Sequence, residues 1–380
     1  ADRYMPAFYL VERAWSRLVG LNITILKIIP AIFGAAATIV IWSILNILAP
    51  TSGAGLACAL LVALHPALIA YSVELRSYSM LMLLSLLTLR YFFTSLDNTR
   101  LRRCMLCLTL ALGSFTHLIF LPFAWLATAL AYVTAGSKER GELRSIIAVF
   151  GCISAAISAW ILRILATREA GTHFTLMSAS WSETVHVAFT NVSRLAAIPH
   201  SLPSGPEISA MTYLALAAGA WALVCKPARL QALLLTLVAP SLGYLLLDCF
   251  KGGMRSTVLR YNLLLALFFC ISYALLITRV AGGRLYLRCI LVLSLATLMR
   301  LSSDDTDEVL KGGRYAELAW YRSAYGTKPA LLLGALDPEH SLEFLLNSHE
   351  GTRLLRASSV VSEQVAQEIS EAVTHRTPVV

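Results

Sequence analysis

Charged residues are scarce in this chain: Asp, Glu, Lys and Arg make up only 14% of its 380 residues. Soluble domains carry about 25%. The hydrophobic fraction of 57% and the mean hydropathy of +0.70 point the same way. Apolar runs of about 20 residues, enough to cross roughly 30 Å of hydrocarbon, recur between residues 28 and 300. These features favour a polytopic membrane protein over a soluble α/β protein, whose apolar strands would be shorter and interrupted by turn residues.

Metal-binding motifs are missing too. The sequence has no His-Glu-x-x-His pattern and no close set of acidic and His residues. Cys104 and Cys107 form a Cys-x-x-Cys pair, but no second pair or His cluster lies nearby, which argues against zinc or redox chemistry. The acidic stretch 304–308 reads as a solvated linker. We therefore expect no cofactor, and no motif supports a divalent metal.

The formal net charge of +9 resides largely in short loops. Because positive residues favour the cytoplasmic side of a membrane, we expect these loops to face the cytoplasm and no nucleic acid to be a partner. The residues concerned are Arg100, Arg102, Arg103, Lys138, Arg140, Arg144, Lys226, Arg229, Arg279, Arg284 and Arg288.

The hydrophobic pattern predicts about ten spans, all of them helical. Their approximate bounds are 28–49, 54–71, 76–95, 104–117, 119–135, 145–166, 209–225, 231–249, 261–278 and 285–300. With this count, the remaining connections fall on the face opposite the basic loops. Two independent signals, charge and span number, thus agree on one topology.

The chain divides into three predicted parts. Residues 1–27 mix aromatic, charged and aliphatic side chains, as an external juxtamembrane segment does. Residues 28–300 form the transmembrane domain. Residues 301–380 read as a small α/β module outside the membrane, with strands near 330–333 and 377–380 and helices near 341–347 and 361–374. No secretory signal peptide opens the sequence, and we expect a further span upstream.

One block of polar residues lies between two apolar segments. Pro66, Ser72, Glu74, Arg76 and Tyr78 stand here with a charge pair at a predicted membrane boundary. Hydrocarbon would penalise both charges, so the block belongs in a headgroup region or a polar cavity. Its residues and spacing resemble a block of GT-C type membrane glycosyltransferases. More narrowly, it resembles the bacterial branch related to dolichyl-phosphate-mannose protein mannosyltransferases, lipid A aminoarabinose transferases and rhizobial galacturonosyltransferases.

Three further stretches resemble the same family in the same order. They are Pro6-Ala7-Phe8-Tyr9 with the following Trp15 to Gly34, Phe115-Thr116-His117 between two spans, and Leu259-Arg260-Tyr261 at the start of a late span. The resemblance covers about residues 1–300. It departs from the family at Tyr4-Met5-Pro6, where the family has His-Pro-Pro, and at Lys27, where the family has Arg.

The resemblance implies an integral-membrane glycosyltransferase. It would move a sugar from a polyprenyl-phosphate donor to a lipid, glycan or protein acceptor at the external leaflet, with inversion. It also implies residence among the lipids of the bacterial inner membrane, a multi-pass topology and a periplasmic active face. The polyprenyl chain cannot leave the bilayer, which explains why such a transferase is built from spans.

The family carries an acidic pair in its first external loop, and the Asp of that pair is the proposed catalytic base. The resemblance places this loop upstream of residue 1. Within the present sequence Asp2 is the one acid at the N-terminal boundary and is carried as a catalytic candidate, together with Glu74.

Positive groups near the interface must stabilise the charge that grows on the leaving phosphate. Arg260 and Tyr261 are the first candidates, because they open the ninth span on the external side. Lys251 and Arg255 precede them in a Gly-containing loop. Snorkelling at the interface is the alternative for all four.

Arg76 is a further phosphate candidate. If a helix has already begun there, Glu74 and Arg76 would lie about 200° apart on it, and we expect them not to be simply each other's partner. A structural clamp is the alternative. His117, in a tight external turn, and Tyr78 are possible site-lining residues, and a helix-capping role is the alternative for His117.

Two other functions remain open. A transporter or lipid flippase would show inverted repeats or broken spans near the bilayer midplane. A non-catalytic accessory subunit would lack the acidic pair. The long connection 167–208 carries an aromatic residue and several charges and could line an acceptor groove.

Overall fold

The fold is given by a computed structural model, which describes residues 6–20, 23–50, 53–94, 99–167, 192, 195–196, 206–251, 262–301, 331–334 and 353–356. The chain forms two compact units. The first, called here the helical unit, consists of Ala1–Leu18 and Lys27–Thr306. The second consists of Val19–Leu26 and Asp307–Val380.

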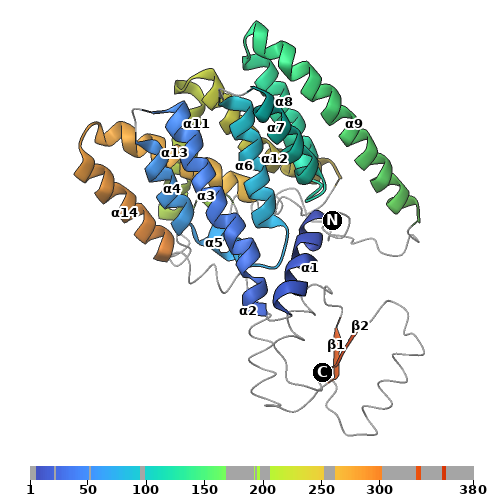
Figure 1. Cartoon of the computed structure of the whole chain (residues 1–380). Coiled ribbons are helices and arrows are strands. Elements are labelled where there is room, and N and C mark those ends of the chain that lie inside the picture. The colour runs from blue at the N-terminus through green and yellow to red at the C-terminus, as the bar shows by residue number, and fades with distance from the viewer. Residues whose placement is uncertain are drawn as a thin grey trace. The chain divides into compact units, whose positions relative to one another are not determined.

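Helices account for nearly all of the described residues (Figure 1). In chain order they are α1 (Ala7–Val19), α2 (Ile23–Leu26), α3 (Ile28–Leu48), α4 (Ala54–Leu64), α5 (Pro66–Ser72), α6 (Tyr78–Phe93), α7 (Thr99–Ser114), α8 (Phe120–Thr134), α9 (Ser137–Thr167), α11 (Pro206–Cys225), α12 (Ala228–Lys251), α13 (Leu263–Ala281) and α14 (Leu285–Leu301).

Several of these helices suit a membrane. Four stretches are long and apolar enough to cross one, or up to five with the bent pair α4–α5: Thr24–Leu48, Glu139–Trp160, Ala228–Leu247 and Leu263–Ala281. Large apolar side chains are exposed on many helices, among them Ile39 at 63% and Leu293 at 63%. Such wide apolar exposure marks a surface that contacts something other than water. The described fold is therefore that of an all-helical unit with several apolar helices of membrane-crossing length.

The region expected as a single span at 54–71 is broken. Helix α4 ends at Leu64, α5 begins at Pro66, and the two are bent by 64°. Proline lacks the N–H of a continuous helix and pushes the preceding residue into an extended conformation. His65 has such a conformation, with φ −69° and ψ 118°. The span predicted at 54–71 therefore corresponds to a bent helix pair, with the break at the residue before this proline.

At one end of the helical unit, arginines cap the preceding helix. Arg102 of α7 donates from Nε to Tyr91 O at 2.7 Å, and Arg140 of α9 donates from Nε to Tyr132 O at 3.2 Å. Arg288 of α14 donates from Nε to Gly282 O at 3.0 Å, just past α13. A positive side chain at a helix C-terminus satisfies its last carbonyls and opposes the negative end of its dipole.

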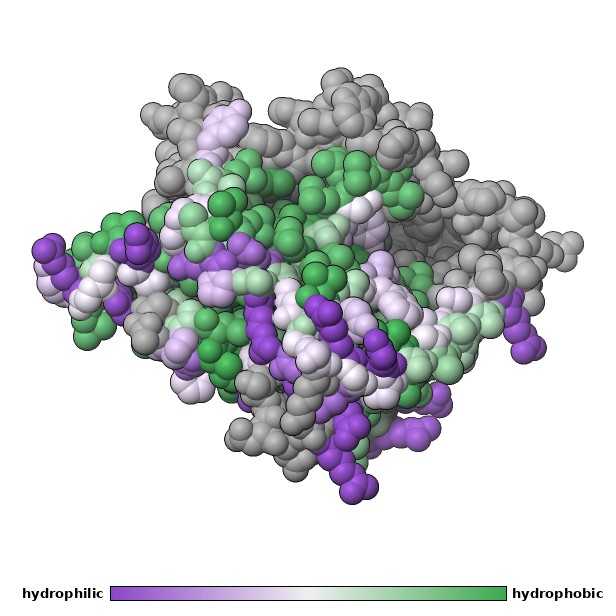
Figure 2. Space-filling view, turned by 90° about the horizontal axis from the view of Figure 1, so that it is seen from above, coloured by the Kyte–Doolittle hydropathy of each residue, from purple (hydrophilic) through white to green (hydrophobic). Residues whose placement is uncertain are grey.

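We call this the basic end. Here α6, α8 and α13 end, and α7, α9 and α14 begin. Arg229, near the start of α12, also forms an ion pair with Glu139 of α9, with Nη2 and Oε2 2.8 Å apart. Burial lowers the pKa of Arg102, and Glu139 and Glu142 oppose this shift. In the view from above, hydrophilic side chains gather over part of the face and apolar ones lie beside them (Figure 2).

The opposite end is formed by two short connections and the N-terminal helix. Residues 73–77 join α5 to α6, and residues 115–119 join α7 to α8. The backbone N–H of Ala7, the first residue of α1, donates to Phe115 O at 3.0 Å. The N-terminal helix therefore starts against the α7–α8 connection.

Glycines allow close helix contacts near this opposite end. A Cβ at Gly34 of α3 would overlap Ser72 Oγ and lie 2.6 Å from Ser72 Cβ, at the end of α5. A Cβ at Gly113 of α7 would overlap the ring of Phe120, the first residue of α8. The first contact brings α5 close to α3, and the second brings the end of α7 close to the start of α8.

Helix α13 is the most enclosed of the four candidate spans, with 78% of its apolar stretch buried. Its aromatic rings pack in sequence, Phe268 against Phe269 at 5.4 Å and Phe269 against Tyr273 at 6.3 Å between ring centroids. The core of the helical unit thus lies around α13.

In the second unit, β1 (Leu331–Gly334) pairs in parallel with β2 (Arg353–Arg356), with Leu331 opposite Arg353 and Gly334 opposite Arg356. The strand expected near 330–333 overlaps β1, and β2 was not expected. The helices expected at 341–347 and 361–374 and the strand at 377–380 lie outside the described residues.

Candidate functional site

Glu74 and Arg76 form an ion pair in the α5–α6 connection. Arg76 Nε lies 3.0 Å from Glu74 Oε1, and the backbone N–H of Arg76 donates to Glu74 O at 2.7 Å. Residues 73–76 are bends rather than helix, and α6 begins only at Tyr78. The two charges are thus partners, although each also takes part in a further interaction. The helix on which the expectation of separate faces rested is absent from residues 73–76.

The pair is buried unequally. The side chain of Arg76 is 3% exposed, whereas that of Glu74 is 25% exposed. A buried guanidinium requires a counter-charge, because taking it out of water is costly. Glu74 supplies that charge and reaches the surface. Both bonds of the pair lie within one connection, so the alternative of a clamp to neighbouring elements stays a prediction.

Tyr78 and His117 lie side by side next to this pair. Their ring centroids are 5.9 Å apart, and Tyr78 also packs edge-on against Tyr71 of α5 at 5.6 Å. Both residues are almost fully buried, at 1% and 2% exposure. Two motif blocks that are about 40 residues apart in the sequence thus meet at the opposite end.

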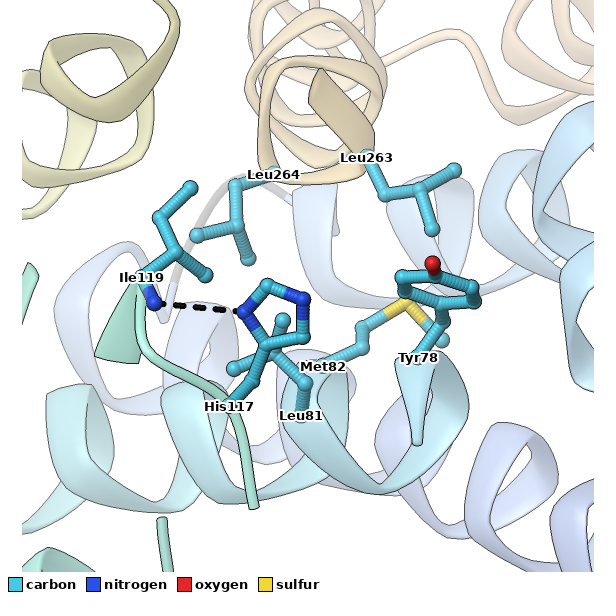
Figure 3. Close-up of a pocket in the computed structure, with 7 residues that line it drawn as sticks. All are labelled: Tyr78, Leu81, Met82, His117, Ile119, Leu263 and Leu264. Carbon is cyan, nitrogen blue, oxygen red and sulfur yellow. Dashed lines mark hydrogen bonds between the residues drawn. The ribbon is translucent and has the colours of Figure 1, made fainter. Parts of the chain in front are cut away.

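A small pocket opens between these two rings and α13 (Figure 3). Its lining comes from α6, the α7–α8 connection and the start of α13: Tyr78, Leu81, Met82, His117, Ile119, Leu263 and Leu264. Most of this lining is apolar, and the imidazole and the phenol are its polar groups. The pocket is small and has room for about one water molecule.

His117 has a structural role within its turn. The backbone N–H of Ile119 donates to His117 Nδ1 at 3.2 Å. Because Nδ1 accepts this bond, the neutral ring carries its proton on Nε2. Figure 3 shows the other ring nitrogen on the side of the pocket away from Ile119. His117 thus stabilises the turn with one nitrogen, and its ring lines the small pocket. Its role in a functional site stays a prediction.

The structure does not show where the other predicted site residues lie relative to Glu74, Arg76, Tyr78 and His117. Asp2, Arg255, Arg260 and Tyr261 lie outside the described residues, and Lys251 is the last residue of α12, with its side chain outside them. The first described residue after Tyr261 is Asn262, which is buried and precedes α13. The phosphate-binding assignments of these residues stay predictions.

The sequence did not single out His65 and Tyr273. Both are buried and donate to backbone carbonyls of the α9–α11 connection: His65 Nε2 to Leu195 O at 2.9 Å and Tyr273 OH to Ala196 O at 3.1 Å. A His-Pro step after an apolar run was the available signal for the first. Nothing local signals the second.

No protein-family model matches this chain, and no curated protein matches it either. Within the ranges that the structure describes, no group of three or more His, Cys, Asp or Glu residues is placed to hold a metal ion. The case for a function therefore rests on the site itself and on the sequence resemblance.

Proposed function

We propose that this protein is an integral-membrane glycosyltransferase that moves a sugar from a polyprenyl phosphate to an acceptor at the external leaflet. One observation carries the proposal. Three motif blocks that are distant in the sequence meet at the opposite end of the helical unit: the start of α1, the connection with Glu74, Arg76 and Tyr78, and the turn with His117.

In the proposed reaction, an acceptor hydroxyl attacks the anomeric carbon as the bond to the phosphate oxygen breaks. The hydroxyl proton passes to a carboxylate, and polyprenyl phosphate leaves. Arg76, oriented by Glu74, contributes positive charge toward the leaving phosphate, together with Arg260, Tyr261, Lys251 and Arg255. Because Glu74 is paired with Arg76, we assign it to orientation of that guanidinium and the proton to another acid, with Asp2 as the candidate in this sequence.

We also propose an orientation of the helical unit in the membrane. The arginine-capped basic end faces the cytoplasm of a bacterial inner membrane, and the opposite end faces the periplasm. Shorter apolar helices such as Tyr78–Phe93 and Phe120–Thr134 complete a total of about ten spans, and a small α/β module follows. The alternation of helix ends between the basic and the opposite end supports this arrangement.

The first test is donor binding. The protein is purified in mild detergent and examined by native mass spectrometry for bound polyprenyl phosphate, with Arg260→Ala as the test variant. Arg284→Ala, an exposed arginine at the basic end, is the matched control. We expect at least about a tenfold loss of bound lipid in Arg260→Ala, as for a lost charge-assisted bond, and wild-type binding in the control. Binding equal in all three proteins, or in none, would contradict the donor assignment.

The broken pair α4–α5 favours a second candidate, a transporter or lipid flippase, because transporters use discontinuous helices. Proteoliposomes separate the two. Sugar transfer from a labelled donor to an acceptor supports the transferase, whereas movement of the donor between leaflets without transfer supports the flippase. An accessory subunit would do neither.

A further inference from the structure

Two cations lie close together where α11 and α13 end, at the basic end of the helical unit. Lys226 follows the last residue of α11, and Arg279 lies in the last turn of α13. The two helices pack against each other. Burial lowers the pKa of Lys226, and the charge of Arg279 lowers it further, because like charges that lie close together repel. We call these two residues the Lys226–Arg279 pair.

Other side chains already fill the usual role of a cation at these two helix ends. A cation at a helix C-terminus commonly bonds the last carbonyls. Here Gln231 Nε2 donates to Val224 O of α11 at 3.2 Å, and Arg288 Nε donates to Gly282 O, just past α13, at 3.0 Å. Among the residues that the structure describes, no carbonyl accepts a hydrogen bond from either member of the Lys226–Arg279 pair.

Carboxylates of the basic end belong to another cluster. Glu139 is paired with Arg229, and Glu142 acts on Arg102. In the described part of the chain, neither member of the Lys226–Arg279 pair forms an ion pair with a carboxylate. Two neighbouring positive charges therefore stand here without a compensating charge from the described residues. An anion bound between them would relieve their repulsion.

The surroundings of the pair indicate what kind of anion it suits. Lys226 Nζ lies over the ring of Trp221, 4.7 Å from its centroid, and Trp is enriched where a membrane meets water. Val224 and Val280, close to the two cations in the sequence, are 77% and 64% exposed. Positive charge beside exposed apolar side chains matches a molecule that has both a phosphate and acyl chains. A soluble phosphate would gain nothing from the two valines.

We propose that the Lys226–Arg279 pair binds the phosphate headgroup of an anionic phospholipid in the leaflet at the basic end, with the acyl chains of that lipid against Val224 and Val280. Each cation then gains a charge-assisted hydrogen bond to a phosphate oxygen. This lipid site is at the end of the helical unit that carries none of the residues proposed for sugar transfer. The inference therefore goes beyond the proposed function, and it stands or falls separately from it.

Native mass spectrometry in mild detergent measures the binding of added phosphatidylglycerol, with phosphatidylcholine as the zwitterionic comparison. We expect wild type to bind phosphatidylglycerol at least about tenfold more tightly. Lys226→Gln and Arg279→Gln should each weaken this binding about fivefold and together about 25-fold, the factor expected for basic side chains at a membrane surface. Lys226→Arg and Arg279→Lys keep the charge and should stay within about twofold of wild type.

The matched control is Arg100→Gln/Arg144→Gln, which removes the same charge from two exposed arginines of α7 and α9. We expect it to bind phosphatidylglycerol like wild type. An equal loss in this control would show that binding follows total charge, and it would overturn the proposal. Equal binding of the two lipids by wild type would overturn it as well.

Glycerol phosphate separates a lipid from a soluble phosphate as the occupant, because it carries the headgroup charge without acyl chains. We expect it to bind at least about tenfold more weakly than phosphatidylglycerol, since it buries no apolar surface. Binding of equal strength would assign the pair to a soluble phosphate and would overturn the lipid assignment.

Discussion

At the residue scale, the pairing of Glu74 with Arg76 shows how a charge enters an apolar helical unit. Arg76 is almost fully buried, and its partner lies only two residues away and reaches the surface. The tight turn at 73–76 makes this possible, because it brings both side chains to the same side. The counter-charge is thus local, so the pair can form before distant helices are packed.

Replacing the Glu74 carboxylate should lower the stability of the protein, because the buried Arg76 guanidinium then lacks its counter-charge. We expect Glu74→Gln to destabilise the protein by about 1–3 kcal/mol, less than for a fully buried pair because Glu74 is a quarter exposed. Thermal unfolding in detergent, followed by intrinsic fluorescence, measures this. Glu142→Gln, at the basic end, is the comparison: its carboxylate helps to keep Arg102 charged, so we expect a smaller loss, below about 1 kcal/mol. An unfolding midpoint that is equal in the two variants would show that the pair contributes nothing to stability.

At the element scale, the contact between α3 and α5 depends on a glycine, which has no side chain. Gly34 leaves room for Ser72, whose hydroxyl donates to Leu68 O at 2.6 Å. Helix α5 has only seven residues and makes correspondingly few packing contacts. The Gly34–Ser72 contact is therefore important for the orientation of α5 after the break at His65.

Gly34→Ala should therefore move α5. We expect a loss of about 1–3 kcal/mol in stability, as overpacking gives, with partial recovery in Gly34→Ala/Ser72→Gly. Gly151→Ala in α9 is the control, because a Cβ there meets nothing within 4 Å. The same fluorescence measurement applies. A Gly34→Ala protein as stable as wild type would mean that α5 shifts without cost.

The sequence predicted parts of this arrangement and missed others for physical reasons. Apolar length and basic loops indicated the helices, and turn residues placed His117 between two of them. The ion pair was missed because a helix was assumed across residues 74–76. The contact of His65 with Leu195 joins residues 130 positions apart, and no periodicity encodes such a contact. Asp2, Arg260 and Tyr261 remain sequence predictions.

At the scale of the whole molecule, the helical unit has two chemically distinct ends. One end carries the arginine caps and the Glu139–Arg229 pair, and the other carries the Glu74–Arg76 pair, Tyr78 and His117. This polarity is what a membrane protein with a site on one face requires.

Cysteine labelling checks the orientation of the two ends. In a background without native cysteines, Gly283→Cys marks the basic end and Val73→Cys, at a position that is 43% exposed, marks the opposite end. We expect a membrane-impermeant maleimide added to intact spheroplasts to label the second variant and not the first. After permeabilisation both should react. The reverse pattern would invert the proposed topology.

The arginine caps also bear on how the chain is made. Arg102, Arg140 and Arg288 each bond the helix that is synthesised just before their own, so the bond is available as soon as one hairpin has emerged from the ribosome. In the proposed topology, this bond closes each hairpin at its cytoplasmic edge while later segments are still being translated. A neutral replacement at these positions would therefore have two effects. It would weaken the charge signal that orients the chain during insertion. It would also leave a newly inserted hairpin without its arginine–carbonyl hydrogen bond until the later helices pack against it.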